Sequence, residues 1–432
     1  MTTEQTISLL FGLAVMVILA RMLGALARRL GQPAVIGEVL AGIALGPTLL
    51  DGAISDALFP ASTRPLLSAL AAVGVAVFMF IVGLEWDAAM IRGSGPIAPS
   101  VSISSIVLPF GLGALLAVYL LDSHGTGNDL AFVLFMGIAM SITAFPVLAR
   151  ILTDRGMART PLGVVALACA SIDDVLAWSL LAAVVAISGS AGADQWHILL
   201  AVPYLLAMLF VVRPFLRRAA ERRAGLGITP AILAFVLAGL LLSAAATEWL
   251  GLHYIFGAFL FGVVLPRAGT ERLRRDVHER LGDMSGTLLL PIFFLVAGLK
   301  VDLSGVGIGG LGDLGLILLV AVGGKFLGAY AAARLNRMPL RQSAALATLM
   351  NTRGLTELIV LNVGLQLGFL GQDLYSLMVV MAVVTTAMAG PLLTRLLGRP
   401  VARDAEGPDD VADVYLLKPV KATAERAQGP AA

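Results

Sequence analysis

Two adjacent carboxylates, Asp173 and Asp174, lie in the middle of the apolar run 160–188, and Lys325 lies near the middle of another, 311–335. Each run is long enough to cross a membrane as a helix. An ionisable group at that depth costs roughly 2.5–3.5 kcal/mol on insertion scales, so those that persist are candidates for function. Carboxylates can exchange protons and bind hard cations, and a lysine too deep to reach the surface needs a buried carboxylate as its partner.

Neighbouring residues on a helix point about 100° apart, so one aspartate can face a cavity while the other pairs with Lys325. In a partly dry cavity desolvation favours the neutral carboxyl group, which can then hold either a proton or a small alkali cation. This competition, with alternate opening to the two sides, is sufficient for exchange. Two structural alternatives remain, a helix cap at a break for the aspartates and a purely structural ion pair for the lysine.

Two apolar runs are interrupted near their centres. In 130–152 the interruption is Ser141-Ile142-Thr143-Ala144-Phe145-Pro146. The proline removes a helix hydrogen bond and disfavours helical geometry at the preceding residue. Freed carbonyls and the hydroxyls of Ser141 and Thr143 are further oxygen ligands for a cation.

The matching interruption in 340–370 is Asn351-Thr352-Arg353-Gly354-Leu355-Thr356-Glu357. Two broken helices in corresponding positions indicate a transporter site, and an offset of seven spans makes them run in opposite directions. Arg353 and Glu357 could neutralise the charged ends of the half-helices. The alternative is an ordinary proline kink with a polar contact between helices.

Composition indicates the class of protein that must position these residues. The chain has 432 residues, of which 58% are hydrophobic and 13% charged, against about 25% charged in a typical soluble domain. A water-soluble globule, a disordered chain and a fibre are excluded. One cysteine, Cys169, and four scattered histidines predict no disulfide framework and no metal cofactor. We expect an all-α polytopic membrane protein that is not an enzyme and needs no cofactor.

About thirteen membrane helices can be placed by length and hydropathy. They are 6–27, 34–50, 65–85, 98–121, 130–152, 160–188, 196–216, 229–247, 252–266, 284–300, 311–335, 340–370 and 373–397. They form a transmembrane domain over 1–398. Residues 399–432 are polar and predict a short, disordered cytoplasmic tail. The first span lacks the features of a cleavable signal peptide.

Basic residues in the loops set the orientation, because cytoplasmic loops are enriched in Lys and Arg. The even-numbered loops hold only Arg64 and Lys300. The odd-numbered loops hold nineteen arginines: Arg28, Arg29, Arg92, Arg150, Arg155, Arg159, Arg213, Arg217, Arg218, Arg222, Arg223, Arg267, Arg272, Arg274, Arg275, Arg280, Arg334, Arg337 and Arg341. The N-terminus is therefore expected outside and the C-terminus in the cytoplasm, with no role for these arginines in binding nucleic acid. The Gly-x-Gly-x-x-Gly pattern at 307–312 follows no strand and predicts no nucleotide site.

Taken together, these motifs resemble the second monovalent cation:proton antiporter family. The resemblance covers about residues 5–398, and the family includes bacterial sodium/proton antiporters, Kef-type potassium efflux systems and plant cation/proton exchangers. It rests on the run from Ile138 through Trp178, on Gly37–Gly42 with Gly46-Pro47, on Phe78–Glu85, on Pro291–Phe294 with Gly298-Leu299, and on Asn351–Leu358.

The resemblance implies a sodium/proton antiporter-like fold with thirteen helices, inverted repeats and two crossed broken helices. A core domain then moves against a dimerisation domain by an elevator-like motion, in a homodimer in the bacterial inner membrane. By position, Asp174 binds the ion and Asp173 pairs with Lys325, a combination generally viewed as electrogenic. Kef-type systems also carry a C-terminal nucleotide-binding regulatory domain, and none is expected in this chain.

The expected function is therefore exchange of a monovalent cation, Na⁺ or K⁺, for protons. The alternatives are a proton-driven exporter of an organic compound or cation–ionophore complex on the same scaffold, a gated cation channel, and a signalling protein that kept the fold.

Overall fold

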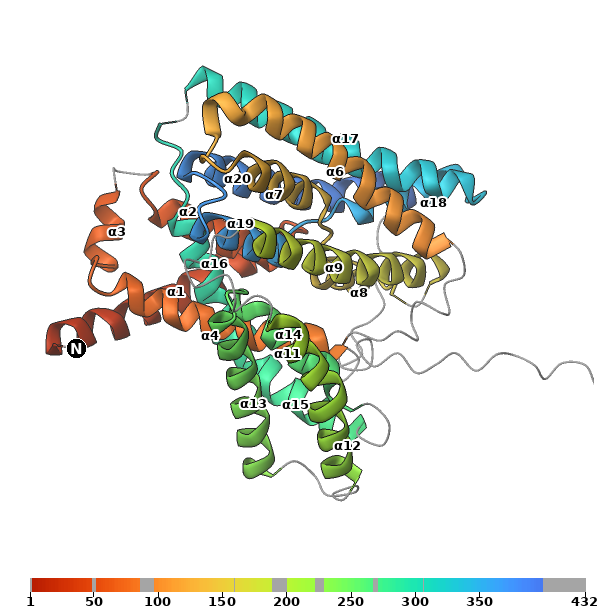
Figure 1. Cartoon of the computed structure of the whole chain (residues 1–432). Coiled ribbons are helices and arrows are strands. Elements are labelled where there is room, and N and C mark those ends of the chain that lie inside the picture. The colour runs from red at the N-terminus through yellow and green to blue at the C-terminus, as the bar shows by residue number, and fades with distance from the viewer. Residues whose placement is uncertain are drawn as a thin grey trace, which may run out of the picture.

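The computed structural model describes residues 2–48, 52–85, 97–158, 160–188, 200–221, 229–266, 271–305 and 307–398. Every regular element within these residues is a helix, and most of the helices pack side by side in two bundles (Figure 1). The expected tail, Arg92, Arg159, Arg222, Arg223, Arg267 and the start of the expected seventh span lie outside the described residues.

The first bundle, called here the crossover bundle, contains both interrupted segments. Its helices α6 and α17 lie along each other at the top of Figure 1, with α7, α9 and α20 beneath them. Its elements are α6 (Ile97–His124), α7 (Asp129–Ser141), α8 (Phe145–Asp154), α9 (Pro161–Ser188), α17 (Ile308–Leu335), α18 (Leu340–Met350), α19 (Leu355–Gln366) and α20 (Gln372–Leu397).

The second bundle, called here the flanking bundle, holds the remaining helices, and in it α4 packs against α14 and α16 while α2 packs between α1 and α16. Its elements are α1 (Thr3–Arg29), α2 (Ala34–Leu45), α3 (Ala53–Leu58), α4 (Arg64–Glu85), α11 (Ala201–Ala207), η2 (Met208–Val212), α12 (Arg213–Glu221), α13 (Pro230–Trp249), α14 (Tyr254–Val264), α15 (Glu271–Met284), η3 (Ser285–Leu289) and α16 (Leu290–Leu299).

Each of the thirteen expected spans corresponds to a helix or an interrupted helix of the described residues. Nine helical stretches there are long and apolar enough to cross a membrane, two apolar helices are shorter, and the seventh and twelfth spans are built from the pieces α11–α12 and α18–α19. The expected fold class, an all-α polytopic membrane protein, is confirmed.

Two expected boundaries were wrong. The tenth span begins at Glu271, and α15, η3 and α16 form one helix to Leu299 through a single π turn. Four arginines expected in the preceding loop, Arg272, Arg274, Arg275 and Arg280, therefore lie on the polar end of this helix. In the same way, Arg213, Arg217 and Arg218 lie on α12, which extends the seventh span to Glu221. Sequence hydropathy ends a span where charges begin, whereas the hydrogen-bonded helix continues past the membrane surface.

The crossover bundle consists of two units with the same order of elements. Each unit is a long helix, an interrupted helix and another long helix: α6, α7–α8 and α9, then α17, α18–α19 and α20. Because corresponding helices of the two units are offset by seven spans, an odd number, the units run in opposite directions, as an inverted repeat requires.

Candidate ion-binding site

The two interrupted helices meet at their unwound residues. The backbone N–H of Ala144 donates to the carbonyl of Thr352 at 3.0 Å, and the hydroxyl of Thr143 lies 2.9 Å from the carbonyl of Met350. Gly354, in the second break, has φ +156°, a conformation that L side chains rarely adopt. The breaks therefore satisfy part of each other's freed backbone, which membrane depth requires.

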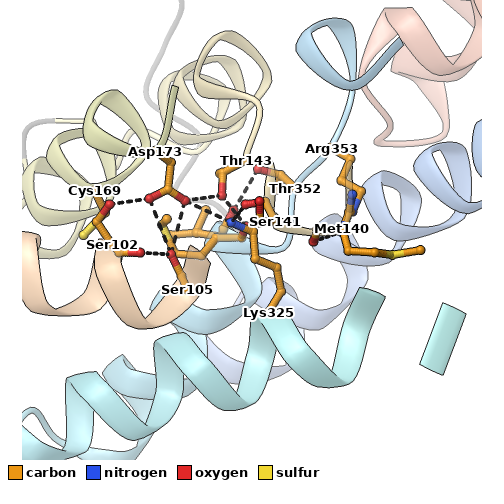
Figure 2. A network of polar contacts seen from close by, with 12 residues as sticks. Ser102, Ser105, Met140, Ser141, Thr143, Cys169, Asp173, Lys325, Thr352 and Arg353 are labelled. Atoms are coloured by element: carbon orange, nitrogen blue, oxygen red, sulfur yellow. Dashed lines mark hydrogen bonds and ion pairs between the residues drawn. The ribbon is translucent and has the colours of Figure 1, made fainter. Parts of the chain in front are cut away.

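Asp173, on α9, is surrounded by donors from three other segments (Figure 2). The hydroxyl of Ser102 donates to Oδ1, and Ser105 Oγ lies 3.2 Å from Oδ2. Thr143 Oγ1 lies 2.8 Å and Lys325 Nζ 2.9 Å from Oδ2. The Lys325 and Asp173 side chains are fully buried, so the partners of this carboxylate are one ammonium group and up to three hydroxyls.

Lys325 is brought to this position by close packing of α17 on α6. A Cβ at Gly328 would lie 2.4 Å from the carbonyl oxygen of Ser104, and one at Gly324 would lie 3.0 Å from Pro109 Cα. The small residues on either side of the lysine thus allow the two backbones to approach. The ammonium group also donates to the carbonyl oxygen of Ser141 at 2.5 Å, which places its charge at the C-terminal end of α7.

Asp174 points away from this network, as adjacent residues on a helix must. It is 4% exposed, and neither carboxylate oxygen has a hydrogen-bond partner among the described residues. The backbone N–H of Phe145, in the first turn of α8, lies near this carboxylate. A buried carboxylate without donors has both oxygens free for a proton or a cation.

Arg353 and Glu357 lie at the two oppositely charged half-helix ends. Arg353 Nη1 and Nη2 each lie 2.5 Å from a carbonyl near the C-terminus of α7, those of Ala139 and Met140. Nη1 also lies 3.0 Å from Glu357 Oε2, and Glu357 occupies the first turn of α19. The cation therefore faces a negative helix end and the anion a positive one.

The structure brings most of the sequence-predicted residues together. Asp173, Lys325 and Thr143 form one network, with Ser141 joining through its carbonyl while its hydroxyl donates to Ile138 O at 2.8 Å. Asp174 adjoins the network on α9, and Arg353 caps the same end of α7 that Lys325 reaches.

Ser102 and Ser105 were missed from the sequence. Their signal is a pair of hydroxyls at i and i+3 inside the apolar segment 98–121, which places both on one helix face. Hydroxyls in membrane helices commonly bond to their own backbone, so the pair alone did not indicate a buried charge.

No cluster of three or more histidine, cysteine, aspartate or glutamate side chains that could hold a resident metal occurs among the described residues. The oxygen atoms near the crossing suit a transiently bound hard cation instead.

Comparison with known proteins identifies the family. The family described as "Sodium/hydrogen exchanger, transmembrane" matches residues 14–399. The chain belongs to the sodium/hydrogen exchanger family. It is 40% identical to the Na(+)/H(+) antiporter NhaS4 of the cyanobacterium Synechocystis over 93% of this chain and 100% of that protein. This family is one of secondary transporters, not of enzymes.

Two eukaryotic relatives and one solved structure extend the comparison. Cation/H(+) antiporter 20 of Arabidopsis thaliana is 38% identical over 88% of this chain, and K(+)/H(+) antiporter 1 of Saccharomyces cerevisiae is 33% identical over 84%. The chain spans 47% and 43% of those two proteins, respectively. The sodium proton antiporter MjNhaP1 from Methanocaldococcus jannaschii superposes with a TM-score of 0.64 at 13% identity, covering 91% of this chain and 98% of that one. The expected antiporter fold is therefore confirmed.

Proposed function

We propose that this chain is a secondary active transporter that exchanges Na⁺ or K⁺ for protons by alternating access, with Asp174 as the shared binding group. The observation that carries the proposal is the contrast between two adjacent carboxylates. Asp173 is surrounded by donors, whereas neither oxygen of Asp174 has a hydrogen-bond partner in the part of the chain that the structure describes. A group that must release its ligand in each cycle cannot be held by permanent partners.

Competition at Asp174 follows from electrostatics. The neutral acid is compatible with a dry site, and the anion is compatible only when a cation replaces the lost water. Binding of the cation and binding of the proton are then mutually exclusive. The oxygens of Thr143 and of the unwound backbone supply further ligands, since alkali cations prefer hard oxygen donors.

Asp173 and Lys325 form the coupling pair in this scheme. If Lys325 keeps its proton throughout, one proton is exchanged per monovalent cation and transport is electroneutral. If the lysine also releases its proton when the cation binds, two protons move and transport is electrogenic. The sensitivity of transport to membrane potential separates these two cycles.

Movement of the crossover bundle against the flanking bundle is the proposed conformational step. Five hydrogen bonds join the bundles near the C-terminus of α16 and the start of α20 among the described residues. Four of them link Lys300 Nζ to Asn362 Oδ1 (2.6 Å), Tyr375 OH to Ala297 O (3.0 Å), Asp302 N to Ser376 Oγ (2.9 Å), and His253 Nε2 to Gln366 Oε1 (3.2 Å). In the fifth, Gln372 Nε2 donates to the carbonyl oxygen of Lys300. In the orientation proposed from the loop charges this end faces outside, and opening on that side then requires these bonds to break.

The proposed setting is the inner membrane of a bacterium, with the N-terminus outside and the 399–432 tail in the cytoplasm after a single transmembrane domain, 1–398. A homodimer is also proposed. Its support is the row of exposed apolar side chains on α1, where Leu10, Phe11, Ile18 and Met22 are each more than half exposed. Lipid or a second copy must cover such a surface.

Proton flux driven by cations in everted membrane vesicles tests the proposal. Addition of Na⁺ or K⁺ to vesicles with an acid interior is expected to release protons at millimolar cation, and the Asp174→Asn variant is expected to lose this activity. Full activity in Asp174→Asn contradicts the site. Flux that requires an added organic solute favours the exporter alternative, and flux without saturation or fixed stoichiometry favours a channel.

A further inference from the structure

Asp173 has more donors than a salt bridge requires. Besides Lys325, hydroxyls of Ser102, Ser105 and Thr143 lie within hydrogen-bonding reach of its two oxygens. Ser102 and Ser105 are fully buried on one face of α6, and Figure 2 shows both pointing toward the carboxylate. Burying these hydroxyls is costly unless they are hydrogen-bonded. Their position at one carboxylate therefore indicates that they stabilise Asp173 in a way that the ion pair with Lys325 does not.

Two of the three hydroxyls have a choice of acceptor. Ser105 Oγ lies 3.2 Å from Asp173 Oδ2 and 2.9 Å from the carbonyl oxygen of Ser102. Thr143 Oγ1 lies 2.8 Å from Asp173 Oδ2 and 2.9 Å from the carbonyl oxygen of Met350. A hydroxyl has one proton to donate, so each can turn toward the carboxylate or toward a backbone carbonyl without any movement of the main chain.

Lys325 is the cation in contact with Asp173 in the described part of the chain. The remaining titratable or charged groups that act on the pair are Asp174 and Cys169 on α9, and Arg353 and Glu357 at the second break. Arg353 and Glu357 form an ion pair with each other, so their charges largely cancel at the lysine. Asp174 adds a like charge when ionised, which increases the need of Asp173 for donors.

We propose that Ser102 and Ser105 are positioning residues that, with Thr143, hold the Asp173 carboxylate in place while Lys325 releases its proton. This inference rests on the proposed function, specifically on the cycle in which the lysine is the second proton carrier. With Lys325 charged, Ser105 and Thr143 can satisfy the backbone carbonyls. After the lysine loses its proton, both hydroxyls turn to the carboxylate and replace the lost donor.

Removal of one serine hydroxyl changes the pH at which exchange proceeds. With fewer donors on Asp173, proton release from the lysine leaves a more poorly stabilised anion and requires a higher pH. A hydrogen bond to a charged group is worth enough to move a titration by about one pH unit or more. The pH of half-maximal exchange is therefore expected to rise by about one unit in Ser102→Ala or Ser105→Ala, with the plateau rate at alkaline pH maintained.

The experiment is a pH profile of cation-driven proton flux in everted vesicles for wild type, Ser102→Ala and Ser105→Ala. Ser104→Ala is the matched control, because Ser104 lies between them on α6 and has no contact with Asp173, and Ser105→Thr restores the hydroxyl. An upward shift in either serine variant, absent in Ser104→Ala and reversed in Ser105→Thr, supports the inference.

Three results overturn the inference: profiles that coincide with wild type, a loss of rate at every pH without a shift, or a Ser105→Thr profile equal to that of Ser105→Ala. Either single variant is sufficient if the other does not accumulate as folded protein. An absence of cation-driven flux in the wild type is a different result, because it removes the proposed function itself.

Discussion

Substitution of the two adjacent aspartates by asparagine is expected to change protein stability in opposite directions, although both substitutions impair exchange. The structure makes this prediction because the two carboxylates differ in their partners and not in their depth. Asp173 is fully buried and Asp174 is 4% exposed, and both come from the centre of α9.

For Asp173→Asn, the cost follows from the ion pair. The side chains of Asp173 and Lys325 are fully buried, with 2.9 Å between Nζ and Oδ2. Loss of one partner from such a pair leaves an uncompensated buried charge and typically costs about 3–5 kcal/mol. Hydroxyls from Ser102 and Ser105 also lose a charged acceptor, so the upper half of this range is expected.

For Asp174→Asn, the free energy of unfolding is expected to increase at alkaline pH. The carboxylate has no hydrogen-bond partner among the described residues, and an unsatisfied buried group costs more when it is charged than when it is neutral. An asparagine there remains unsatisfied but carries no charge. The free energy of unfolding is therefore expected to rise by about 1–2 kcal/mol, the difference between the two penalties.

The assay is thermal unfolding of the purified protein in detergent at pH 8, with Na⁺ or K⁺ compared with an equal concentration of choline. Binding of a ligand at 100 times its Kd stabilises the native state by about 2.7 kcal/mol. This cation-dependent increase in Tm is expected in wild type and absent in Asp174→Asn. Asp122→Asn, which removes an exposed carboxylate from α6, is the control, with an expected change within about 0.5 kcal/mol.

Two outcomes would refute the reasoning. If both aspartate substitutions lower the Tm equally, the difference in hydrogen-bond donors around Asp173 and Asp174 does not affect stability. If Asp174→Asn keeps the cation-dependent increase in Tm, the cation binds elsewhere.

Three further predictions follow from other parts of the molecule. Gly354→Ala is expected to reduce exchange at least about tenfold, because residue 354 has φ +156° and a Cβ there would lie 2.6 Å from Val147 Cγ2. Cation-driven proton flux in vesicles measures this effect. The control is Gly371→Ala, where an added Cβ meets nothing within 4 Å. Arg353→Gln is expected to lower the free energy of unfolding by about 3–5 kcal/mol, measured by thermal unfolding, because a buried carboxylate and two carbonyls at the end of α7 lose their partner. Burial lowers the pKa of His253, between α13 and α14, so the unfolded chain binds more protons than the folded one and stability falls as pH drops through about 6.5. The Tm is therefore expected to fall less between pH 8 and pH 5 in His253→Gln than in wild type. An equal fall in both proteins would contradict this.

The positions of the spans could be predicted from sequence because hydropathy over about 20 residues reflects one dominant energy, the transfer of side chains into hydrocarbon. The helix ends could not be predicted as well. The segment 271–284 is charged and was expected to be a loop, yet it continues the helix of the tenth span. Helix formation depends on backbone hydrogen bonds that persist in water, so hydropathy does not detect it.

At the candidate site, the charged residues and the pairing of Asp173 with Lys325 were predictable, and the other partners were not. Asp173, Asp174, Lys325 and Arg353 are conspicuous because each is costly in an apolar run. The serines of α6 cost little and so gave no signal. The acceptors of Arg353 and Lys325 are backbone carbonyls, which every residue has, so only the three-dimensional crossing shows which of them lie at the end of α7.

The adjacency of the two aspartates itself has a physical consequence. Because successive residues diverge by about 100° on a helix, α9 presents one carboxylate to the donors of α6 and α17 and the other to the unwound start of α8. In the proposed function, a single rigid helix thus fixes the distance between the carboxylate that stays paired and the one that exchanges its ligand. In the proposed cycle, repulsion between the two carboxylates makes cation or proton binding at Asp174 more favourable. If two of the donors of Asp173 were removed together, by Ser102→Ala and Ser105→Ala in one chain, only Thr143 and Lys325 would remain as its partners, and the upward shift of the pH profile expected for either single variant would become larger.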